Sequence, residues 1–357
     1  MILLKILVDI GHPAHVHLFK NFIWLLEKKG HTICITARDK EITLLLLDRY
    51  NFKYSIISRF KKGIVHIGKE MIFKDFNLLK IIKSQKPDIM LAVLDPSITH
   101  VGCLLKIPTV TLTDTEHAKL AKIMTFPFTD VILTPSSYAE HLGKKQVFYN
   151  GYHELAYLHP NHFIPNPDVL TEMGFTQDDP FIIVRFVSWQ ASHDVGHHGI
   201  KDKIRFVKEL ENYGRVLITS EGTLPEELQP YQIRISPEKL HDMLYYASLY
   251  VGEGATMATE AALLGTPAIY ISSLAGTMGN FIELEKKYDL MYSFSDSDTA
   301  LQKALDILRN PESKGKWAVK RERIVRDKID VTTFLMQFIE NYPQSFTEYK
   351  DHRDSSQ

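Results

Sequence analysis

Two alternating patterns of apolar residues run along this chain. Short, almost uninterrupted apolar runs, such as residues 5–9, 88–93 and 249–252, are typical of strands buried on both faces of a parallel sheet. Between such runs lie longer segments with apolar residues at helical spacing, for example residues 15–29, which end at Gly30. Strands that alternate with helices predict an α/β chain with doubly wound parallel sheets.

The predicted elements fall into two groups. In the first half of the chain, strands are expected at residues 5–9, 32–36, 55–57, 88–93, 109–113, 131–134 and 146–149, and helices at 15–29, 41–50, 69–85 and 96–105. In the second half, strands are expected at 181–187, 215–219, 232–235, 249–252 and 268–271, and helices at 203–212, 237–247, 280–287, 298–309 and within 321–342.

Prolines and other turn-forming residues interrupt this alternation between residues 158 and 180. A chain of this length also favours two domains. We therefore expect a first domain at residues 1–157, a linker at 158–179, a second domain at 180–325, a terminal helix at 326–343 and a flexible polar tail at 344–357.

Composition narrows the class of protein. Of 357 residues, 45% are hydrophobic and 24% charged, which is ordinary for a soluble globular protein. The net charge of −1 offers no basic surface for nucleic acid. The two cysteines, Cys34 and Cys103, lie in apolar surroundings and indicate free thiols in a reducing compartment.

No apolar run reaches the roughly 20 residues of a membrane helix. We expect a cytoplasmic protein, and residues 119–128, which mix lysine with apolar side chains, leave open a peripheral contact with the inner face of the membrane.

Residues 251–267 carry the clearest functional signal, because they predict a strand, a glycine turn and a short helix. Gly254, Ala255 and Thr256 stand where the helix begins, and backbone N–H groups at a helix start attract phosphate oxygens. Glu260 lies one turn further on, where its carboxylate can accept hydrogen bonds from a ribose diol. The segment predicts a nucleotide diphosphate site; an ordinary α/β turn is the alternative.

This organisation, with the segment Gly252-x-Gly254…Glu260-Ala-Ala-Leu-Leu-Gly-Thr-Pro267, resembles the GT-B glycosyltransferase superfamily. Residues 9–17, 149–158 and 185–196 make the chain similar to the domain-of-unknown-function family 354, which is related to the non-hydrolysing UDP-N-acetylglucosamine 2-epimerases. The likeness covers about residues 1–340. It implies two Rossmann-like domains facing a cleft, with a terminal helix that returns to the first domain.

The resemblance also implies roles for residues of the second domain. Glu260 would hold the nucleotide ribose, the turn from Gly254 to Thr256 would meet the diphosphate, and Arg185 would contact the phosphates. Ser220 ends another expected strand and either lines the nucleotide pocket or forms a simple turn.

The segment around His193 contains several histidines but lacks the ligand spacing of a metal site. A loop that binds phosphate or sugar through His193 fits better, and we expect no metal and no cofactor besides the UDP-sugar substrate.

Four residues of the first domain are candidates for acid–base chemistry. His12 and His15 occupy the first strand-to-helix turn, where either is a candidate base for an acceptor hydroxyl; capping of the helix is the alternative. Asp95 and Glu116 follow two later strands, at about the places where the epimerases carry acid–base carboxylates. Asp95 precedes a proline and is equally suited to capping a helix.

The leading hypothesis is a GT-B glycosyltransferase that transfers sugar from a UDP-sugar to a saccharide or lipid-linked acceptor during synthesis of a cell-surface polysaccharide or glycolipid. The first alternative is a non-hydrolysing UDP-N-acetylhexosamine 2-epimerase, which needs no acceptor. The second alternative is a non-catalytic protein that binds nucleotide sugars.

Overall fold

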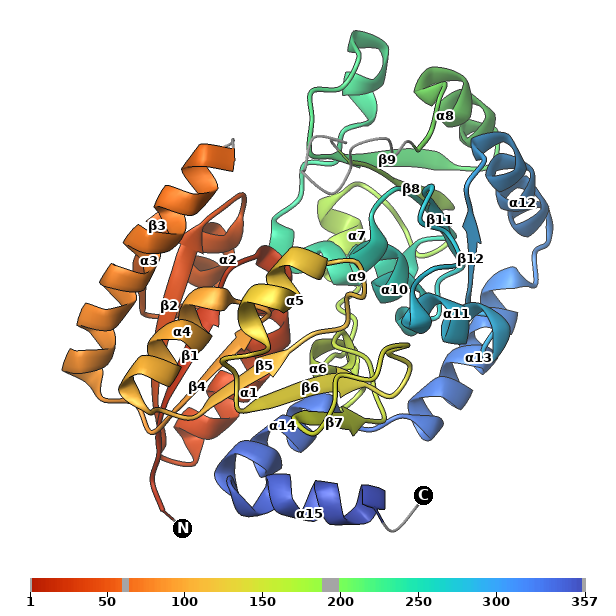
Figure 1. The fold of residues 1–357 in the computed structure, drawn as a ribbon. Helices are drawn as coiled ribbons and strands as arrows, with labels where there is room; N and C mark the ends of the chain where they lie inside the picture. Colours follow the sequence, from red (N-terminus) through yellow and green to blue (C-terminus); the bar gives the residue numbers. More distant parts are fainter. Residues whose placement is uncertain (1, 60–63, 188–198, 355–357) are drawn as a thin grey trace. The chain divides into compact units, whose positions relative to one another are not determined.

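Figure 1 shows the computed structural model, which describes residues 2–59, 64–187 and 199–354. The chain divides into two compact units. Unit 1 consists of Met1–His162 together with Ile329–Gln357, and unit 2 consists of Phe163–Lys328. Each unit is built on one parallel sheet with helices on its faces, which confirms the predicted doubly wound α/β class.

The sheet of unit 1 has seven strands in the order β3-β2-β1-β4-β5-β6-β7. Its strands are β1 (Lys5–Ile10), β2 (Thr32–Asp39), β3 (Tyr54–Arg59), β4 (Ile89–Val93), β5 (Thr109–Leu112), β6 (Val131–Pro135) and β7 (Gln146–Tyr149). All neighbouring pairs are parallel. The strand order reverses between β1 and β4, and ligands of doubly wound sheets bind beyond the carboxyl ends of the strands at such a point.

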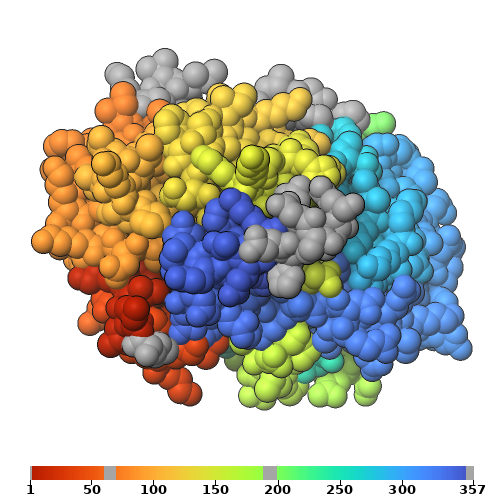
Figure 2. Space-filling view, turned by 60° about the horizontal axis from the view of Figure 1, so that its bottom comes forward, coloured from red at the N-terminus to blue at the C-terminus, as the bar shows by residue number. Residues whose placement is uncertain are grey.

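The helices of unit 1 come from both ends of the chain. They are α1 (Pro13–Lys28), α2 (Thr43–Arg49), α3 (Ile64–Gln85), α4 (Pro96–Leu105), α5 (Lys119–Thr125), α6 (Leu155–Leu158), α14 (Val331–Glu340) and α15 (Gln344–Asp354). Helix α14 packs on α1 and α6, and Figure 2 shows the dark blue C-terminal residues against the red start of the chain. The core between β1, β4, α3 and α4 is apolar, with Leu7, Leu78, Met90 and Ile98 fully buried.

The sheet of unit 2 has five strands in the order β12-β11-β10-β8-β9. Its strands are β8 (Phe181–Phe186), β9 (Arg215–Ser220), β10 (Leu249–Gly252), β11 (Ala268–Ile271) and β12 (Met291–Phe294). Its helices are α7 (Asp168–Glu172), α8 (Lys203–Glu211), α9 (Leu240–Tyr246), α10 (Ala255–Leu264), α11 (Gly279–Lys286), α12 (Ser297–Arg309) and α13 (Ser313–Asp327), with 3₁₀ turns η1 (Glu226–Tyr231) and η2 (Pro237–Lys239). Here the strand order reverses between β8 and β10.

Two sequence predictions of secondary structure fail. Residues 232–235 form no strand, and only an isolated bridge joins Gln232 to Ile218, because 3₁₀ turns that contain Pro230 and Pro237 flank this segment. The expected flexible tail after residue 344 contains helix α15 instead. The Oγ of the buried Ser345 donates to the carbonyl oxygen of Phe338, and the ring of Tyr349 packs on the same phenylalanine, so tertiary contacts hold this polar segment.

Candidate functional site

The carboxyl end of the sheet in unit 2 gathers most of the predicted nucleotide-binding residues. Arg185 lies near the end of β8, Ser220 ends β9, and Gly254 follows β10 as the N-cap of α10. Because β8 is paired with both β9 and β10, the three positions come from adjacent strands at the point where the strand order reverses.

Close backbone packing explains the two glycines of this turn. Gly252 pairs with Arg185 across β10 and β8, and a Cβ at residue 252 would overlap the backbone of Arg185. A Cβ at Gly254 would lie 2.9 Å from Cγ of the same arginine. The glycines therefore bring the arginine side chain against the first turn of α10, where no side chain caps the helix. Open backbone N–H groups beside a guanidinium form an anion-binding arrangement.

The arginine is positioned by a carboxylate. Arg185 Nη2 donates to Glu221 Oε1 at 2.7 Å, and Glu221 follows directly after β9. The Arg185 side chain is 21% exposed, so it can reach a ligand at this edge. Ser220 forms a tight turn, since its Oγ donates to the carbonyl oxygen of Gly222 at 2.9 Å.

The side chain of Glu260 lies on a face of α10 that is turned away from solvent. The residue is buried, and His241 Nε2 of α9 donates to its Oε1 at 2.9 Å. In the first turn of the same helix, Ala255 is half-buried and Thr256 is exposed. The pairing of His241 with Glu260 could not be predicted from the sequence, because the two residues are 19 positions apart in the chain. The predicted contact of Glu260 with a ribose stays a prediction.

Glu253 is a second residue of this edge that the sequence did not single out. Its two carboxylate oxygens accept the backbone N–H groups of Val187 and Ile200, each at 2.8 Å. Glu253 thus joins the end of β10 to the chain on both sides of residues 188–198. His193 falls in that interval, outside the described residues, so its predicted role stays a prediction.

At the carboxyl end of the unit 1 sheet, a buried lysine joins two carboxylates across the reversal point. Lys74 Nζ of α3 lies 2.9 Å from Asp9 Oδ2 of β1 and 2.5 Å from Asp95 Oδ2 after β4. Burial alone would lower the pKa of Lys74, but the two carboxylates outweigh it and hold that pKa above its ordinary value. Burial raises the pKa of Asp9. Asp95 also caps α4 through the backbone N–H of Ile98, as the capping alternative predicted.

The two candidate histidines occupy the β1–α1 turn in different ways. His12 caps α1, because its Nδ1 accepts the backbone N–H of Ala14 at 3.2 Å. His15 Nδ1 accepts the backbone N–H of Gly11 at 3.2 Å. Burial lowers the pKa of His15 well below its ordinary value, and neighbouring His12 and His153 add to the effect. The neutral His15 ring therefore carries its proton on Nε2 and presents a hydrogen-bond donor.

A third histidine of this edge is paired with a carboxylate. His153 Nδ1, after β7, lies 3.3 Å from Asp114 Oδ2, after β5. Burial alone would raise the pKa of Asp114, but His153 outweighs it and lowers that pKa. The buried Nε2 on the other side of the His153 ring has no hydrogen-bond partner within the described chain. A separation of 39 positions along the chain hid this pair from sequence analysis.

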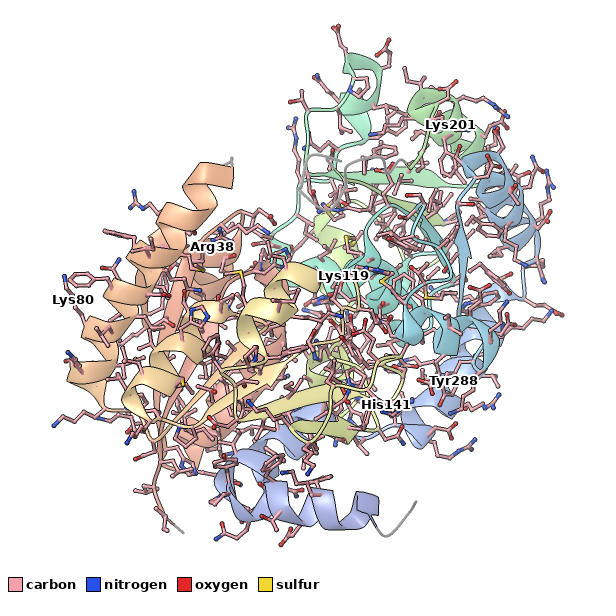
Figure 3. All side chains as sticks on the ribbon, in the orientation of Figure 1. Arg38, Lys80, Lys119, His141, Lys201 and Tyr288 are labelled. Carbon is pink, nitrogen blue, oxygen red and sulfur yellow. The ribbon has the colours of Figure 1, made fainter. Side chains whose placement is uncertain are left out.

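The remaining polar groups of this edge have structural contacts. Glu116 is buried, and its Oε1 accepts the backbone N–H of Ala139 at 3.2 Å. Arg38, labelled in Figure 3, stands near the end of β2 and donates through Nε and Nη2 to the two carboxylate oxygens of Glu70. Within residues 2–59, 64–187 and 199–354, no group of three His, Cys, Asp or Glu side chains is arranged to hold a metal ion.

Comparison with solved structures defines the class to which this architecture belongs. The chain is similar to UDP-N-acetylglucosamine 2-epimerase of Neisseria meningitidis bound to UDP-N-acetylglucosamine, at 12% identity and a TM-score of 0.67, over 94% of this chain and 99% of that one. It is also similar to a glycosyltransferase of Streptomyces sp. SF2575, at 14% identity and a TM-score of 0.60, over 95% and 100% of the two chains. The fold is that of the GT-B enzymes.

Sequence comparison identifies the family. The family described as a protein of unknown function, DUF354, matches residues 4–342, and the chain belongs to it. An uncharacterised protein of Methanocaldococcus jannaschii is 25% identical over 303 residues, which are 80% of this chain and 87% of that protein. Among the described residues, no helix is long and apolar enough to cross a membrane.

Proposed function

We propose that this protein is a glycosyltransferase that takes its sugar from a UDP-sugar and builds a cell-surface polysaccharide or glycolipid. The observation that carries the proposal is the edge of unit 2, where Arg185 lies against the uncapped start of α10 and Glu260 is oriented one turn further in. These are the groups that a diphosphate and a ribose require. The positive end of α10 and Arg185 would stabilise the leaving diphosphate without a metal.

Fold neighbours support the same class of ligand. The Neisseria epimerase is described as bound to UDP-N-acetylglucosamine, and the Streptomyces neighbour is described as a glycosyltransferase. Both classes act on activated sugars, so the proposed donor agrees with the fold and with the edge of unit 2.

In this proposal, unit 1 supplies the groups that handle the acceptor hydroxyl. His15 presents an N–H, so it would donate a hydrogen bond to a substrate oxygen. His153, paired with Asp114, would accept the proton of the hydroxyl on its Nε2. We propose His153 as the base in place of His15, because the Nδ1 of His15 accepts a backbone N–H and the Nδ1 of His153 lies beside a carboxylate.

The test combines binding and turnover. Calorimetry should detect UDP binding to the purified protein, and NMR of UDP-N-acetylglucosamine without acceptor should show ligand contact with an unaltered sugar. Activity with an acceptor should survive a chelator; complete loss that one metal restores would contradict the metal-free mechanism. Absence of UDP binding would overturn the proposal.

The second candidate is the non-hydrolysing 2-epimerase. Asp95 and Glu116, which follow the adjacent strands β4 and β5, are carboxylates of the kind that its acid–base chemistry needs. Formation of a 2-epimer, or of free UDP with 2-acetamidoglucal, in the same NMR sample would favour it. Binding without turnover under any acceptor would favour a non-catalytic nucleotide-sugar binder.

A further inference from the structure

Helix α5 of unit 1 has two apolar side chains that face solvent and two polar side chains that face inward. Leu120 and Ile123, three residues apart on one face, are 71% and 70% exposed. Lys122 and Thr125, on the opposite face, are buried, and Lys122 Nζ donates to Glu140 Oε2 at 2.6 Å. A helix that faces water normally has the reverse arrangement. This inversion indicates that the outer face of α5 contacts something other than water.

A groove of about 770 Å³ lies beside this face of α5. Four lysines and four apolar residues line it, and none of these lining residues is acidic. Phe126 and Leu142 contribute apolar walls, while Lys119, seen at the start of α5 in Figure 3, and Lys144 are exposed at its margin. Lys145 Nζ donates to the carbonyl oxygen of Pro127 at 2.9 Å, which fixes a third positive charge there.

Exposed apolar side chains continue over the neighbouring helices. Helix α4 contacts both α5 and α3, and Figure 1 shows the three helices on the same face of the unit 1 sheet. Leu104 of α4 is 71% exposed. On α3, Ile72 is 70% exposed and Phe73 is 62% exposed. Neighbouring exposed apolar groups with a positive margin characterise a surface that contacts a membrane.

We propose that this α5 surface, defined by Leu120, Ile123, Lys119 and Lys144, docks on a bilayer that contains anionic phospholipids. The two aliphatic side chains enter the boundary between headgroups and acyl chains, and the lysines lie against lipid phosphates. The biological purpose rests on the proposed function, since docking would bring unit 1 to a lipid-linked acceptor. The docking itself requires no sugar nucleotide, so it is tested separately.

The experiment is co-sedimentation of the full-length protein with vesicles of phosphatidylcholine alone or mixed equally with phosphatidylglycerol. We expect binding to the anionic vesicles that weakens as salt is raised from about 0.1 M to 1 M, where the screening length falls to about 3 Å. The double variant Leu120→Gln/Ile123→Gln should lose about tenfold or more in partitioning. Lys119→Glu/Lys144→Glu should lose about as much at low salt.

Ile164→Gln and Val319→Gln are matched controls, because these side chains are 85% and 67% exposed in unit 2 and should leave partitioning unchanged. Equal binding of the α5 variants and wild type, or no binding of wild type to anionic vesicles, would overturn the proposal. A soluble dimer that dissociates on the same α5 substitutions would also overturn it, by assigning the surface to a second copy of the chain. UDP affinity of the α5 variants, measured in parallel, reports separately on the proposed function.

Discussion

Replacing Lys74 by methionine tests the buried ion cluster at the edge of unit 1. Methionine preserves most of the side-chain volume but removes the ammonium that lies 2.9 Å from Asp9 Oδ2 and contacts Asp95. Asp9 is only 1% exposed and would retain Thr36 Oγ1, at 2.6 Å, as its remaining side-chain donor. Asp95 is 19% exposed in its side chain and can turn toward water. The penalty therefore falls mainly on Asp9.

Leaving one buried carboxylate without its charged partner costs about 3–5 kcal/mol. At about 1.4 kcal/mol per tenfold change, this corresponds to a loss of roughly 10²- to 10⁴-fold in protection against hydrogen exchange in β1 and β4. Without the lysine, the pKa of Asp9 in the folded state rises further above its unfolded value. A raised carboxyl pKa removes stability as pH increases from the unfolded pKa to the folded one, so the penalty should grow from about pH 4 upward.

Hydrogen-exchange mass spectrometry of β1 and β4 peptides measures this change within unit 1, with β10 of unit 2 as an internal reference. Lys80→Met is the matched control, because Lys80 lies on the same helix but is exposed, and its loss should change stability by less than about 0.5 kcal/mol. Lys74→Met/Asp9→Asn should recover much of the protection, since both buried charges are gone. A Lys74→Met effect no larger than that of Lys80→Met would show that Asp9 does not depend on the lysine.

Three further predictions concern other residues. Glu260→Ala should weaken UDP binding about tenfold or more in calorimetry and leave His241 without its buried partner; unchanged affinity would remove the ribose assignment. His15 should remain neutral with its proton on Nε2 at pH 7 in ¹⁵N NMR, and His15→Ala should lower turnover while sparing UDP binding; a protonated ring, or full activity, would contradict its donor role. Asp330 has a pKa lowered by hydrogen bonds from His162 and Asn161 that outweigh burial, so it contributes stability above its unfolded pKa that is lost as pH falls. Asp330→Asn should destabilise unit 1 by about 1–2 kcal/mol at pH 7 in chemical unfolding, and the difference should shrink below about pH 4; a difference independent of pH would argue against an ionic contribution.

Elements with a continuous apolar run between turn residues were predictable almost to the residue. Strand β10, helix α4 and strand β11 have the bounds expected from sequence, because apolar runs mark the strands and Pro96 and Pro267 mark boundaries. The turn at Gly254 and the position of Glu260 on the following helix were predictable for the same reason, since the whole segment is local.

Features that depend on distant residues were not predictable. Nothing near Lys74 marks it as buried, because its partners Asp9 and Asp95 come from two strands that only the sheet order makes neighbours. The pairs His241–Glu260 and His153–Asp114 likewise join separate elements. The spacing of apolar residues shows which residues share one face of a helix, but it does not show whether that face is turned to the core or to solvent.

The α/β class, most strands and the glycine turn before α10 could be read from the amino-acid sequence. These follow from apolar periodicity and from glycine and proline, whose effects act over a few residues. The ionic partners, the nitrogen of neutral His15 that carries the proton, and the outward direction of Leu120 on α5 came only from the folded arrangement. The physical reason is that desolvation and charge pairing depend on neighbours in space, which chain folding brings together from remote positions.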